Sequence, residues 1–321
     1  MPSVRDGAMD RPDLAQIRAA AERLRPLIHR TPIVTSRLLD EAVGRRVFLK
    51  AECLQKAGSF KIRGAATAIQ ALGTEARGAG VVAHSSGNHA QAVALAARHF
   101  GVDAVVVMPE DANRFKVAAT KAYGATVVQD GVTTANRAAR ADEYVGQGRY
   151  LIHPFDDWAV ITGQGTVGLE IAEDAPDDIE MVLVPIGGGG LISGSAIALR
   201  ALRPHIRIIG VEPAACAAAK ASRAAGRRVS LPPAPTVADG ARMSVGDKAW
   251  SVISELVDDI VSVNDEEILA AVHFILTRTK LVVEPTGAMT VAALLSRRSP
   301  DGAAAAVLSG GNLDPEILAQ R

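Results

Sequence analysis

The sequence predicts an α/β protein in which mostly parallel sheets are covered by helices on both faces. Apolar runs typical of buried strands alternate with segments of helical periodicity, and short glycine-marked turns join them. This alternation begins near residue 80 and recurs after residue 178. We therefore expect two α/β blocks, over about 78–150 and 160–321, with no charged or serine-rich linker between them.

The first elements precede these blocks. A helix is expected over 13–28, because Leu14, Ile17 and Leu24 recur at the spacing of one helical face. A short strand is expected over 45–52. The first block should then alternate between strands and helices. Its strands are expected over 80–85, 103–109 and 125–129, and its helices over 87–101 and 113–124.

The second block repeats this order. The apolar run "MVLVPI" is typical of a strand that is buried on both faces. The proline-rich stretch 226–238 is expected to be a connection within the block. The strands of this block are expected over 178–186, 206–213 and 303–311, and its helices over 190–202 and 265–279.

The composition argues against several classes of protein. In 321 residues, 35 basic side chains balance 35 acidic ones and only 3% are aromatic, so nucleic acid is not expected as a partner. Cys53 and Cys216 are far apart and give no zinc-binding spacing. No apolar run is long enough to span a bilayer, so no membrane partner is expected. The charged first residues do not resemble a signal peptide, and a cytoplasmic protein is expected.

Lys61 lies in an unusually apolar context, between Phe60 and Ile62 in "AGSFKIRGAA". In a confined apolar site, desolvation disfavours the charged form of an amine. A neutral lysine can attack an aldehyde and form a Schiff base. The alternative is a partly buried lysine at the start of a helix, whose ammonium group reaches water. The local context leaves both interpretations open.

The strongest local signal is the run of four glycines, Gly187 to Gly190, between an apolar strand and a helix. Glycines lack the Cβ atoms that would keep a ligand from the backbone. Their N–H groups, with a helix N-terminus behind them, form an anion cradle suited to phosphate. The alternative is a plain strand–helix turn, although such a turn does not need four glycines. The loop is not a Walker motif, because no Lys-Ser/Thr pair follows it.

A second glycine motif, "GQGTVG" at 163–168, has the GxGxxG spacing of dinucleotide-binding sites. The preceding "HPFDDWAV" contains proline and two aspartates and is not a clean buried strand. No ribose-binding acid follows at the expected distance. We therefore expect these glycines to allow close packing of helices.

A third candidate site lies in "VVAHSSGNHAQAVALAA" at 81–97, where a strand is followed by Ser85 and Ser86 and a helix begins at Asn88. Helix capping alone could explain the serines. Free N–H groups at a helix start can also bind a carboxylate, and α/β proteins bind ligands where parallel strands end. His89 is expected to pack within the helix rather than to act as a base.

Together these motifs resemble the fold-type II pyridoxal-phosphate enzymes, and among them the threonine/serine dehydratase and serine racemase family. The resemblance extends from "HRTPIVTS" at 29–36 to "LSGGN" at 308–312. The order and spacing of its pieces make it specific. These pieces include "KAECLQKAGSFKIRGA", "SSGNHAQA", "TGQGTVGLEI", "IGGGGLISG", "VADG" and "EPTGA".

The resemblance implies a fold of the tryptophan-synthase-β type, with two open, twisted, mostly parallel sheets and helices on both faces. It implies a large domain formed by residues 1–75 and 153–321 and a small domain formed by residues 76–152. It also implies pyridoxal 5'-phosphate (PLP) as the cofactor, a small amino acid as the substrate, and a homodimer or higher homo-oligomer.

The same resemblance implies roles for individual residues. Lys61 and Ser86 would be catalytic, with Lys61 also attached to the cofactor as a Schiff base. Asn88 would bind the ring hydroxyl, Ser309 would face the ring nitrogen, and Glu284 would either tune charge or make a structural hydrogen bond. The implied cofactor-binding residues are Phe60, Lys61, Asn88, Gly187, Gly188, Gly189, Gly190, Glu284 and Ser309. The implied substrate-binding residues are Ser85, Ser86, Asn88 and His89.

The expected activity is that of a threonine/serine ammonia-lyase, which converts a 3-hydroxy amino acid to a 2-oxo acid and ammonia. A serine racemase or a 3-hydroxyaspartate dehydratase is the alternative. Ser86 occupies the position of the second acid/base of serine racemases, whereas "HPFDDWAVITGQGT" is more similar to the dehydratases. A β-replacement enzyme is disfavoured because that group usually has "SGNT" in place of "SGNH".

Two alternatives come from other classes. A nucleotide-binding dehydrogenase would depend on "GQGTVG" alone. A catalytically inactive binding protein is disfavoured because Lys61, Asn88, Ser309 and the glycine run are all retained.

The chain also departs from the family pattern. Serine racemases hold a divalent cation after "VEP", through a glutamate, a backbone carbonyl and a second acid. Here Glu212 is present, Cys216 is at the carbonyl position and Ala218 replaces the acid, so we expect no metal site. Asn113 stands where relatives usually have proline. The chain ends soon after "LSGGN", so a C-terminal regulatory domain is not expected.

Overall fold

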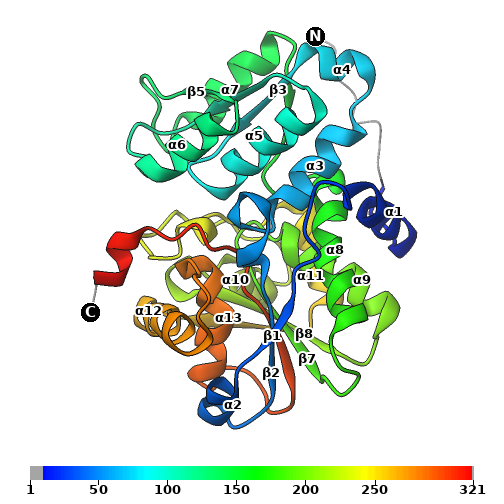
Figure 1. The fold of residues 1–321 in the computed structure, drawn as a ribbon, viewed down its shortest axis with the longest axis vertical. Coiled ribbons are helices and arrows are strands. Elements are labelled where there is room, and N and C mark those ends of the chain that lie inside the picture. Colours follow the sequence, from blue (N-terminus) through cyan, green and yellow to red (C-terminus); the bar gives the residue numbers. More distant parts are fainter. Residues whose placement is uncertain (1–9, 320–321) are drawn as a thin grey trace.

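The computed structural model describes residues 10–319, which form two separate sheets (Figure 1). The six-stranded sheet has the order β1-β2-β10-β7-β8-β9. Its β1–β2 pair is antiparallel and its other pairs are parallel. The four-stranded sheet, β5-β4-β3-β6, is parallel throughout. The strands are β1 (Ile33–Thr35), β2 (Val47–Lys50), β3 (Val81–His84), β4 (Ala104–Val107), β5 (Thr126–Val128), β6 (Tyr150–Leu151), β7 (Met181–Pro185), β8 (Arg207–Pro213), β9 (Asp259–Val263) and β10 (Ala304–Val307).

Helices connect these strands and cover both sheets. Within the described part of the chain, none of them is both long and apolar enough to cross a membrane. Short 3-10 turns lie at η1 (Glu52–Leu54), η2 (Lys56–Gly58) and η4 (Asp239–Ala241). The α-helices are α1 (Leu14–Leu24), α2 (Arg37–Val43), α3 (Lys61–Ala71), α4 (Thr74–Ala79), α5 (Asn88–Phe100), α6 (Arg114–Ala122), α7 (Arg137–Gly146), α8 (Trp158–Asp174), α9 (Gly190–Leu202), α10 (Ala218–Ala225), α11 (Asp247–Leu256), α12 (Asp265–Phe274) and α13 (Pro285–Leu295).

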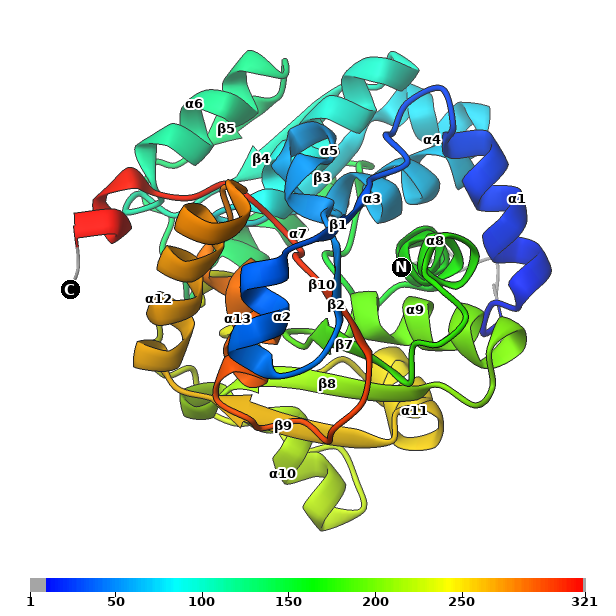
Figure 2. The same cartoon turned by 60° about the horizontal axis from the view of Figure 1, so that its bottom comes forward.

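The six-stranded sheet is buried on both faces. Leu183 and Ile209 share an apolar cluster with side chains of α2, α12 and α13. Their chain neighbours Val182 and Ile208 share another cluster with α8, α9 and α11. Figure 2 shows these two groups of helices on opposite sides of the sheet. Because successive strand residues point to opposite faces, burial on both faces explains why the strands are continuous apolar runs.

The four-stranded sheet follows the same rule. Ala83 and Val106 pack in a cluster with the alanine-rich face of α5. Val82 and Val105 belong to a separate cluster that includes Ala141 of α7. The short glycine-marked turns of the sequence are therefore the strand–helix connections of a doubly covered parallel sheet.

Helix α3 lies between the two sheets (Figure 1). Ile62 and Ile69 pack in the same cluster as Val93 of α5, while the other side of the helix contacts α8. A Cβ added at Gly163 would overlap the backbone of Arg63. The glycines of "GQGTVG" therefore lie inside α8 and allow close helix packing, as the sequence predicted.

Each strand and helix predicted from the sequence corresponds to an element of the structure; the predicted helix over 190–202 matches α9, and the other elements have shifted ends. The predicted helix over 13–28 ends at Leu24, and that over 265–279 ends at Phe274 before a π-helical turn. The division into domains at residues 76 and 153 stays a prediction. Elements that the pattern did not predict as such are β1, β6, β9, α2, α3, α4, α7, α8, α10, α11 and α13.

Candidate active site

A pocket of about 770 Å³ opens where strands of both sheets end. It is lined by the loop after β3, by the glycine run after β7 and by Ser309 after β10. Open α/β sheets bind ligands outside the carboxyl ends of their strands. The pocket brings together every site residue that the sequence predicted, namely Phe60, Lys61, Ser85, Ser86, Asn88, His89, Gly187, Gly188, Gly189, Gly190, Glu284 and Ser309.

Lys61 is the first residue of α3, and its Nζ donates a hydrogen bond to the Pro154 carbonyl at 2.7 Å. The same nitrogen lies 5.1 Å from the centroid of the Phe60 ring. Burial lowers the pKa of Lys61 to about 8, although the charge of Glu284 opposes this shift. A substantial fraction of the amine is therefore neutral near physiological pH, which is the form that attacks a carbonyl group.

The glycine run forms a tight concave loop at the start of α9. Gly189 has a φ of +91°, and a Cβ at Gly188 would overlap the ring of Phe155. The N-cap of α9 has no side-chain hydrogen bond. None of the described residues accepts a hydrogen bond from the backbone N–H groups of Gly187 to Gly190. These unpaired donors at a helix N-terminus form a site for an anion.

The loop between β3 and α5 also ends at an uncapped helix. Gly87, the N-cap of α5, supplies no side-chain hydrogen bond. The Ser85 hydroxyl accepts a hydrogen bond from Gly87 N at 3.2 Å, and the Ser86 hydroxyl lies 3.4 Å from Arg137 Nη1. The first N–H groups of α5 therefore face the pocket without a capping side chain, which suits a carboxylate.

The side chain of His89 packs against the end of β6. It is buried, and its Nε2 is 2.8 Å from the carbonyl oxygen of Ile152. Burial holds the pKa of His89 well below its ordinary value, so the ring is neutral. The burial and this hydrogen bond support packing of His89 within α5, and its role at the site stays a prediction.

Asn88 is held by two partners. Its Nδ2 donates a short hydrogen bond to Glu284 Oε1, and its Oδ1 accepts one from Asn312 Nδ2 at 2.8 Å. Glu284 is the N-cap residue of α13 and is buried. Burial raises the pKa of Glu284 to about 7, against the opposing charge of Lys116. This contact fixes the orientation of the Asn88 amide, and it leaves Glu284 Oε2 without a hydrogen bond from the described residues.

Lys116 is a pocket residue that sequence reasoning missed. It extends from α6, next to the four-stranded sheet, and its Nζ reaches Asp239 Oδ2 at 2.7 Å and Glu284 Oε2 at 3.7 Å. Both partners lie on the side of the six-stranded sheet. The only sequence signal was its place in the atypical segment "DANRFK". In this segment Asn113 caps α6 and donates a hydrogen bond to Asp314 Oδ2 at 2.5 Å.

Arg137 and two histidines also line the pocket without having been predicted. Arg137 has no carboxylate partner among the described residues, and burial lowers its pKa. His153 Nδ1 accepts a hydrogen bond from Asp156 N at 2.8 Å, and burial lowers the pKa of His153 to about 4. His84 Nδ1 is buried with no hydrogen-bond partner in the described chain. These residues reach the pocket through tertiary packing, which leaves no local motif.

Ser309 lies two residues beyond β10. Its carbonyl oxygen accepts a hydrogen bond from Phe60 N at 3.1 Å and so ties this strand end to the residue before Lys61. Its side chain lines the pocket, and none of the described residues makes a hydrogen bond with its hydroxyl. The hydroxyl is therefore free to contact a ligand.

The predicted departure at the "VEP" segment has a structural counterpart. The two oxygens of Glu212 accept hydrogen bonds from Ala219 N at 3.0 Å and Lys220 N at 2.8 Å. Burial raises the pKa of Glu212 to about 7. In this structure the carboxylate binds the first turn of α10. The absence of a metal here stays a prediction.

The residues of the pocket fit PLP. Lys61 is a lysine with a lowered pKa, as an aldehyde requires. The glycine run offers unpaired N–H groups and a concavity that a Cβ would fill, as a phosphate requires. An α/β enzyme with a lysine and an anion cradle in one pocket corresponds to the fold-type II PLP enzymes.

Comparison with known proteins gives the same class. Residues 24–310 match the family described as "Pyridoxal-phosphate dependent enzyme", and the chain belongs to this family. It is 43% identical to a serine racemase of Oryza sativa subsp. indica over 316 residues, which cover 95% of this chain and 92% of the relative. It is 41% identical to an L-threo-3-hydroxyaspartate ammonia-lyase of Saccharomyces cerevisiae over 307 residues, with 94% of each chain covered.

A solved structure supports the fold assignment. The crystal structure of a threonine deaminase from T.th. superposes with a TM-score of 0.90 at 49% sequence identity, covering 94% of this chain and 99% of that one. The fold is therefore that of the type II PLP enzymes, and the cofactor is PLP. The chain belongs to the part of this family that contains ammonia-lyases and racemases of amino acids.

Proposed function

We propose that the protein is a PLP-dependent ammonia-lyase that converts L-serine or L-threonine to a 2-oxo acid and ammonia. The observation that carries the proposal is a single pocket that contains Lys61, the glycine run and the uncapped start of α5. The similarity to a threonine deaminase and to a hydroxyaspartate ammonia-lyase supports elimination as the reaction type.

The glycine run binds the cofactor phosphate. The unpaired N–H groups of Gly187 to Gly190, at the positive end of α9, would hold the phosphate. Asn88, oriented by Glu284, would contact the ring hydroxyl of the cofactor. Ser309 offers a neutral hydroxyl to the ring nitrogen, and a neutral partner does not force that nitrogen to stay protonated. When bound, PLP supplies the conjugated ring over which the charge at the substrate α-carbon is spread.

Lys61 is the base. Its lowered pKa allows it to be neutral when it takes the proton from the α-carbon of the amino acid. The N–H groups at the start of α5, beside Ser85 and Ser86, bind the substrate carboxylate and orient the Cα–H bond towards Lys61. Loss of the β-hydroxyl as water, followed by hydrolysis of the C–N bond, gives the 2-oxo acid and ammonia. The water consumed in the hydrolysis balances the water released.

Racemisation of serine is the second candidate, and Ser86 favours it. A racemase needs a second proton donor on the face of the α-carbon opposite to Lys61. Ser86 lines the pocket, and its hydroxyl is 3.4 Å from the Arg137 guanidinium, which stabilises an ionised oxygen. The similarity to the rice serine racemase supports this candidate to the same degree.

Arg137 also favours a dicarboxylic substrate such as 3-hydroxyaspartate. A guanidinium that faces a pocket without a carboxylate partner among the described residues is suited to a second carboxylate on the substrate. The similarity to the yeast L-threo-3-hydroxyaspartate ammonia-lyase supports the same substrate.

One assay separates these candidates. Purified enzyme with PLP is incubated with L-serine, L-threonine or L-threo-3-hydroxyaspartate, and 2-oxo acid, ammonia and the D-amino acid are measured. We expect oxo acid and ammonia in equal amounts from L-serine and L-threonine. D-serine formed faster than pyruvate would replace the proposal with racemisation, and turnover of hydroxyaspartate alone would replace it with the dicarboxylic substrate. No product from any of the three would overturn it.

A further inference from the structure

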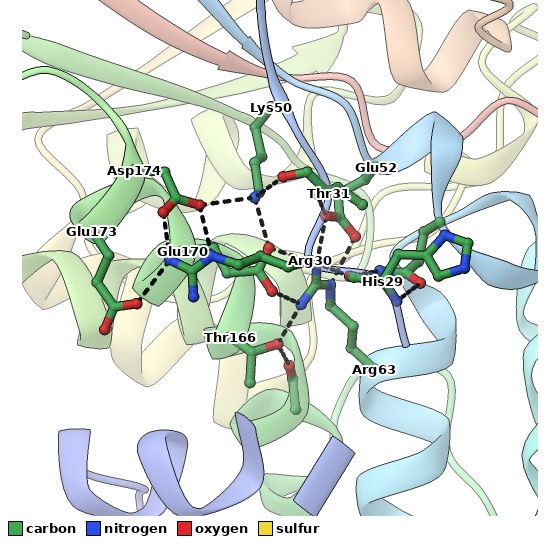
Figure 3. A network of polar contacts seen from close by, with 12 residues as sticks. His29, Arg30, Thr31, Lys50, Glu52, Arg63, Thr166, Glu170, Glu173 and Asp174 are labelled. Carbon is green, nitrogen blue, oxygen red and sulfur yellow. Dashed lines mark hydrogen bonds and ion pairs between the residues drawn. The ribbon is translucent and has the colours of Figure 1, made fainter. Parts of the chain in front are cut away.

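Four buried charged side chains form a connected network beside the helix that begins with Lys61. Figure 3 shows them between the sheet and helix α8. They are Lys50, Glu52, Arg63 and Glu170, and we call them the Arg63 network. Each is less than a tenth exposed, and Lys50, Glu52 and Arg63 are completely buried. No local pattern in the sequence predicts this network, because isolated charged residues are usually expected at the surface.

Arg63 is the centre of the network. Its Nε and Nη2 donate hydrogen bonds to the two oxygens of Glu52 at 2.8 and 2.7 Å. Its Nη1 and Nη2 donate to the two oxygens of Glu170 at 2.7 and 2.9 Å. Thr166 Oγ1 accepts a further hydrogen bond from Nη1 at 3.0 Å. The planar guanidinium therefore makes a bidentate contact with each carboxylate, a geometry that lysine cannot reproduce.

Lys50 completes the charge balance. Its Nζ is 2.6 Å from Glu170 Oε2 and donates to the Thr31 carbonyl at 2.6 Å. Within the Arg63 network two cations thus face two carboxylates, and at its edge Asp174 Oδ2 lies 3.9 Å from Lys50 Nζ. Burial disfavours the charged forms of Glu52 and Arg63, but their partners together outweigh it. Arg63, with Thr31 and Lys50, lowers the pKa of Glu52, and Glu52 and Glu170 raise the pKa of Arg63. The two groups at the centre of the network therefore keep each other ionised at neutral pH.

The network joins four elements, and two of them, α3 and α8, approach each other closely at glycines. Lys50 ends β2, Glu52 begins η1, Arg63 is in the first turn of α3, and Glu170 is on α8. The contact between α3 and α8 is lined by Gly163 and Gly64, whose Cβ atoms would overlap the facing helix. A contact between small residues sets the distance between helices but offers few side chains that interlock against sliding or rotation. Directional hydrogen bonds to a fixed guanidinium supply that restraint.

Besides Arg63, the start of α3 is held by two hydrogen bonds to backbone carbonyls, from Lys61 Nζ to Pro154 O at 2.7 Å and from Phe60 N to Ser309 O at 3.1 Å. The N-cap residue of α3, Phe60, makes no side-chain capping hydrogen bond. Lys61 is two residues before Arg63, and the helix also packs against α5, which belongs to the four-stranded sheet. Apolar packing connects α3 to α5 and to α8, and it leaves the rotation of α3 less strictly fixed than directional hydrogen bonds do. With the Arg63 network, α3 is fixed to β2 and α8, on the side that carries the glycine run.

We propose that Arg63 is a positioning residue, which fixes the rotation and height of α3 so that Lys61 Nζ meets the aldehyde of a cofactor whose phosphate is held by residues 187–190. A buried ion network is not needed for stability alone, because desolvation of the charges cancels much of their attraction. Restraint of the position of α3 would give the Arg63 network a function beyond stability. The inference rests on the proposed role of Lys61, and it does not depend on which substrate is used.

The test measures attachment of the cofactor in the absence of substrate. Cofactor-free protein is mixed with PLP, the absorbance band of the lysine adduct is followed over a pH series, and the adduct is fixed with borohydride and mapped by mass spectrometry. Arg63→Lys keeps the charge but loses the bidentate geometry, and we expect attachment at Lys61 to slow about tenfold or more, since a small misplacement of reacting groups has a large effect on rate. Thr166→Val removes one hydrogen bond from Arg63 and should slow attachment by a smaller factor.

A matched control separates positioning from stability. Leu39→Ala removes a completely buried side chain of α2, in a different apolar cluster from α3. It should lower the melting temperature and leave the rate and pH profile of attachment unchanged. Wild-type attachment in Arg63→Lys, or equal slowing in Leu39→Ala, would overturn the inference. If Arg63→Lys yields no folded protein, the test depends on Thr166→Val. A wild-type rate of attachment in Thr166→Val would then overturn the inference. Absence of lyase activity would refute the proposed function and leave this result standing.

Discussion

The chemistry of the site depends on how burial changes single charged residues. Lys61 loses part of its preference for the charged form, because water is replaced by Phe60 and the pocket wall. Burial also disfavours the charged form of Glu284, and because this group is an acid its pKa rises to about 7. A base and an acid with shifted pKa values in one pocket are typical of a catalytic site.

Replacing Lys61 tests its role as base and attachment point. Lys61→Ala should fold, because the helix that it begins is held by Arg63 and by apolar packing. Turnover should fall by about 10³-fold or more, since both a base and a covalent link are removed. Circular dichroism should give the wild-type spectrum, and a 2-oxo acid assay measures the loss. Turnover near the wild-type value would remove Lys61 from the mechanism.

The pH dependence of cofactor attachment follows from the lowered pKa. In cofactor-free enzyme, Lys61 is mainly protonated below pH 8 and mainly neutral above it, and only the neutral amine reacts. The initial rate of its reaction with PLP should therefore rise with pH and level off above about pH 8. Stopped-flow absorbance measures this rate. A rise that continues to the ordinary lysine pKa of 10.5 would contradict the account.

The charge of Glu284 should affect the pH at which Lys61 begins to react with PLP. The negative charge of Glu284 raises the pKa of Lys61 against the effect of burial. Glu284→Gln removes the charge and keeps the shape, so the midpoint of the attachment profile should move to lower pH. Glu316→Gln, at an exposed residue of the C-terminal segment, is the matched control and should leave it unchanged. A shift to higher pH in Glu284→Gln would show that the two groups do not interact as described.

At this scale the sequence predicted the residues that belong to local motifs. Lys61 was found from its apolar neighbours, and the glycines of 187–190 from their repetition. Arg137 and Lys116 were missed because they enter the pocket from other elements, and nothing around them in the sequence marks that approach. Arg63 was missed because its burial depends on Glu170, 107 residues along the chain, as well as on Glu52.

The elements around the pocket are built for close backbone approach. The loop from β7 to α9 needs Gly189 at positive φ and Gly188 against the ring of Phe155. Small residues serve a different purpose in α8, where they let α3 and α9 pack closely. Glycine therefore has two functions in adjacent elements, and the surrounding pattern distinguished them in the sequence.

Adding one methyl group to the glycine run tests its proposed role in binding the cofactor phosphate. In Gly188→Ala the new Cβ would collide with Phe155, so the loop must move and its N–H groups lose their common direction. We expect PLP affinity to fall by about 10- to 100-fold, which corresponds to the loss of one or two charge-assisted hydrogen bonds. Fluorescence titration of cofactor-free enzyme with PLP measures the affinity.

The control for this variant is Gly78→Ala, because a Cβ there has no neighbour within 4 Å. It lies in the short helix α4 and should leave PLP affinity unchanged. A similar loss in both variants would show that the effect is not specific to the glycine run.

Prediction of the elements succeeded where burial produced a repeating pattern. Strands buried on both faces, such as β7 and β4, are continuous apolar runs and were predicted. The strands β1 and β6 contain three and two residues, too few for any periodicity to appear. Helix α8 was not predicted as a whole because 14 of its 17 residues are buried, which removes the polar face that marks an amphipathic helix.

In the whole molecule, the pocket lies where the parts around the two sheets meet, and contacts across it connect them. Lys116 on α6 reaches Asp239 and Glu284, and Asn113 on the same segment reaches Asp314. A Cβ on Gly87 would lie 3.5 Å from Lys116 Nζ, so this lysine is directly beneath the proposed substrate-binding loop. The contacts of Lys116 and Asn113 therefore hold the proposed substrate-binding loop next to the elements that would bind the cofactor. Assembly into a homo-oligomer stays a prediction.

Removing the charge of Lys116 tests this connection. Lys116→Met keeps the apolar stem and loses both ion pairs, and Glu284 loses its opposing charge. We expect KM for the amino-acid substrate to rise about tenfold, because a buried charge is left without its partner and the loop is less well held. Lys121→Met, at an exposed lysine of the same helix, should leave KM unchanged. Equal KM values in the two variants would contradict a connection through Lys116.

The most direct test of the whole account is the chemical location of the cofactor. Enzyme purified with PLP is reduced with borohydride, digested and mapped, and the phosphate contacts are read from a crystal structure of the same preparation. The account predicts one pyridoxyl group, on the ε-nitrogen of Lys61, with its phosphate against the backbone of residues 187–190. A pyridoxyl group on another lysine, or a phosphate held elsewhere in the pocket, would contradict it.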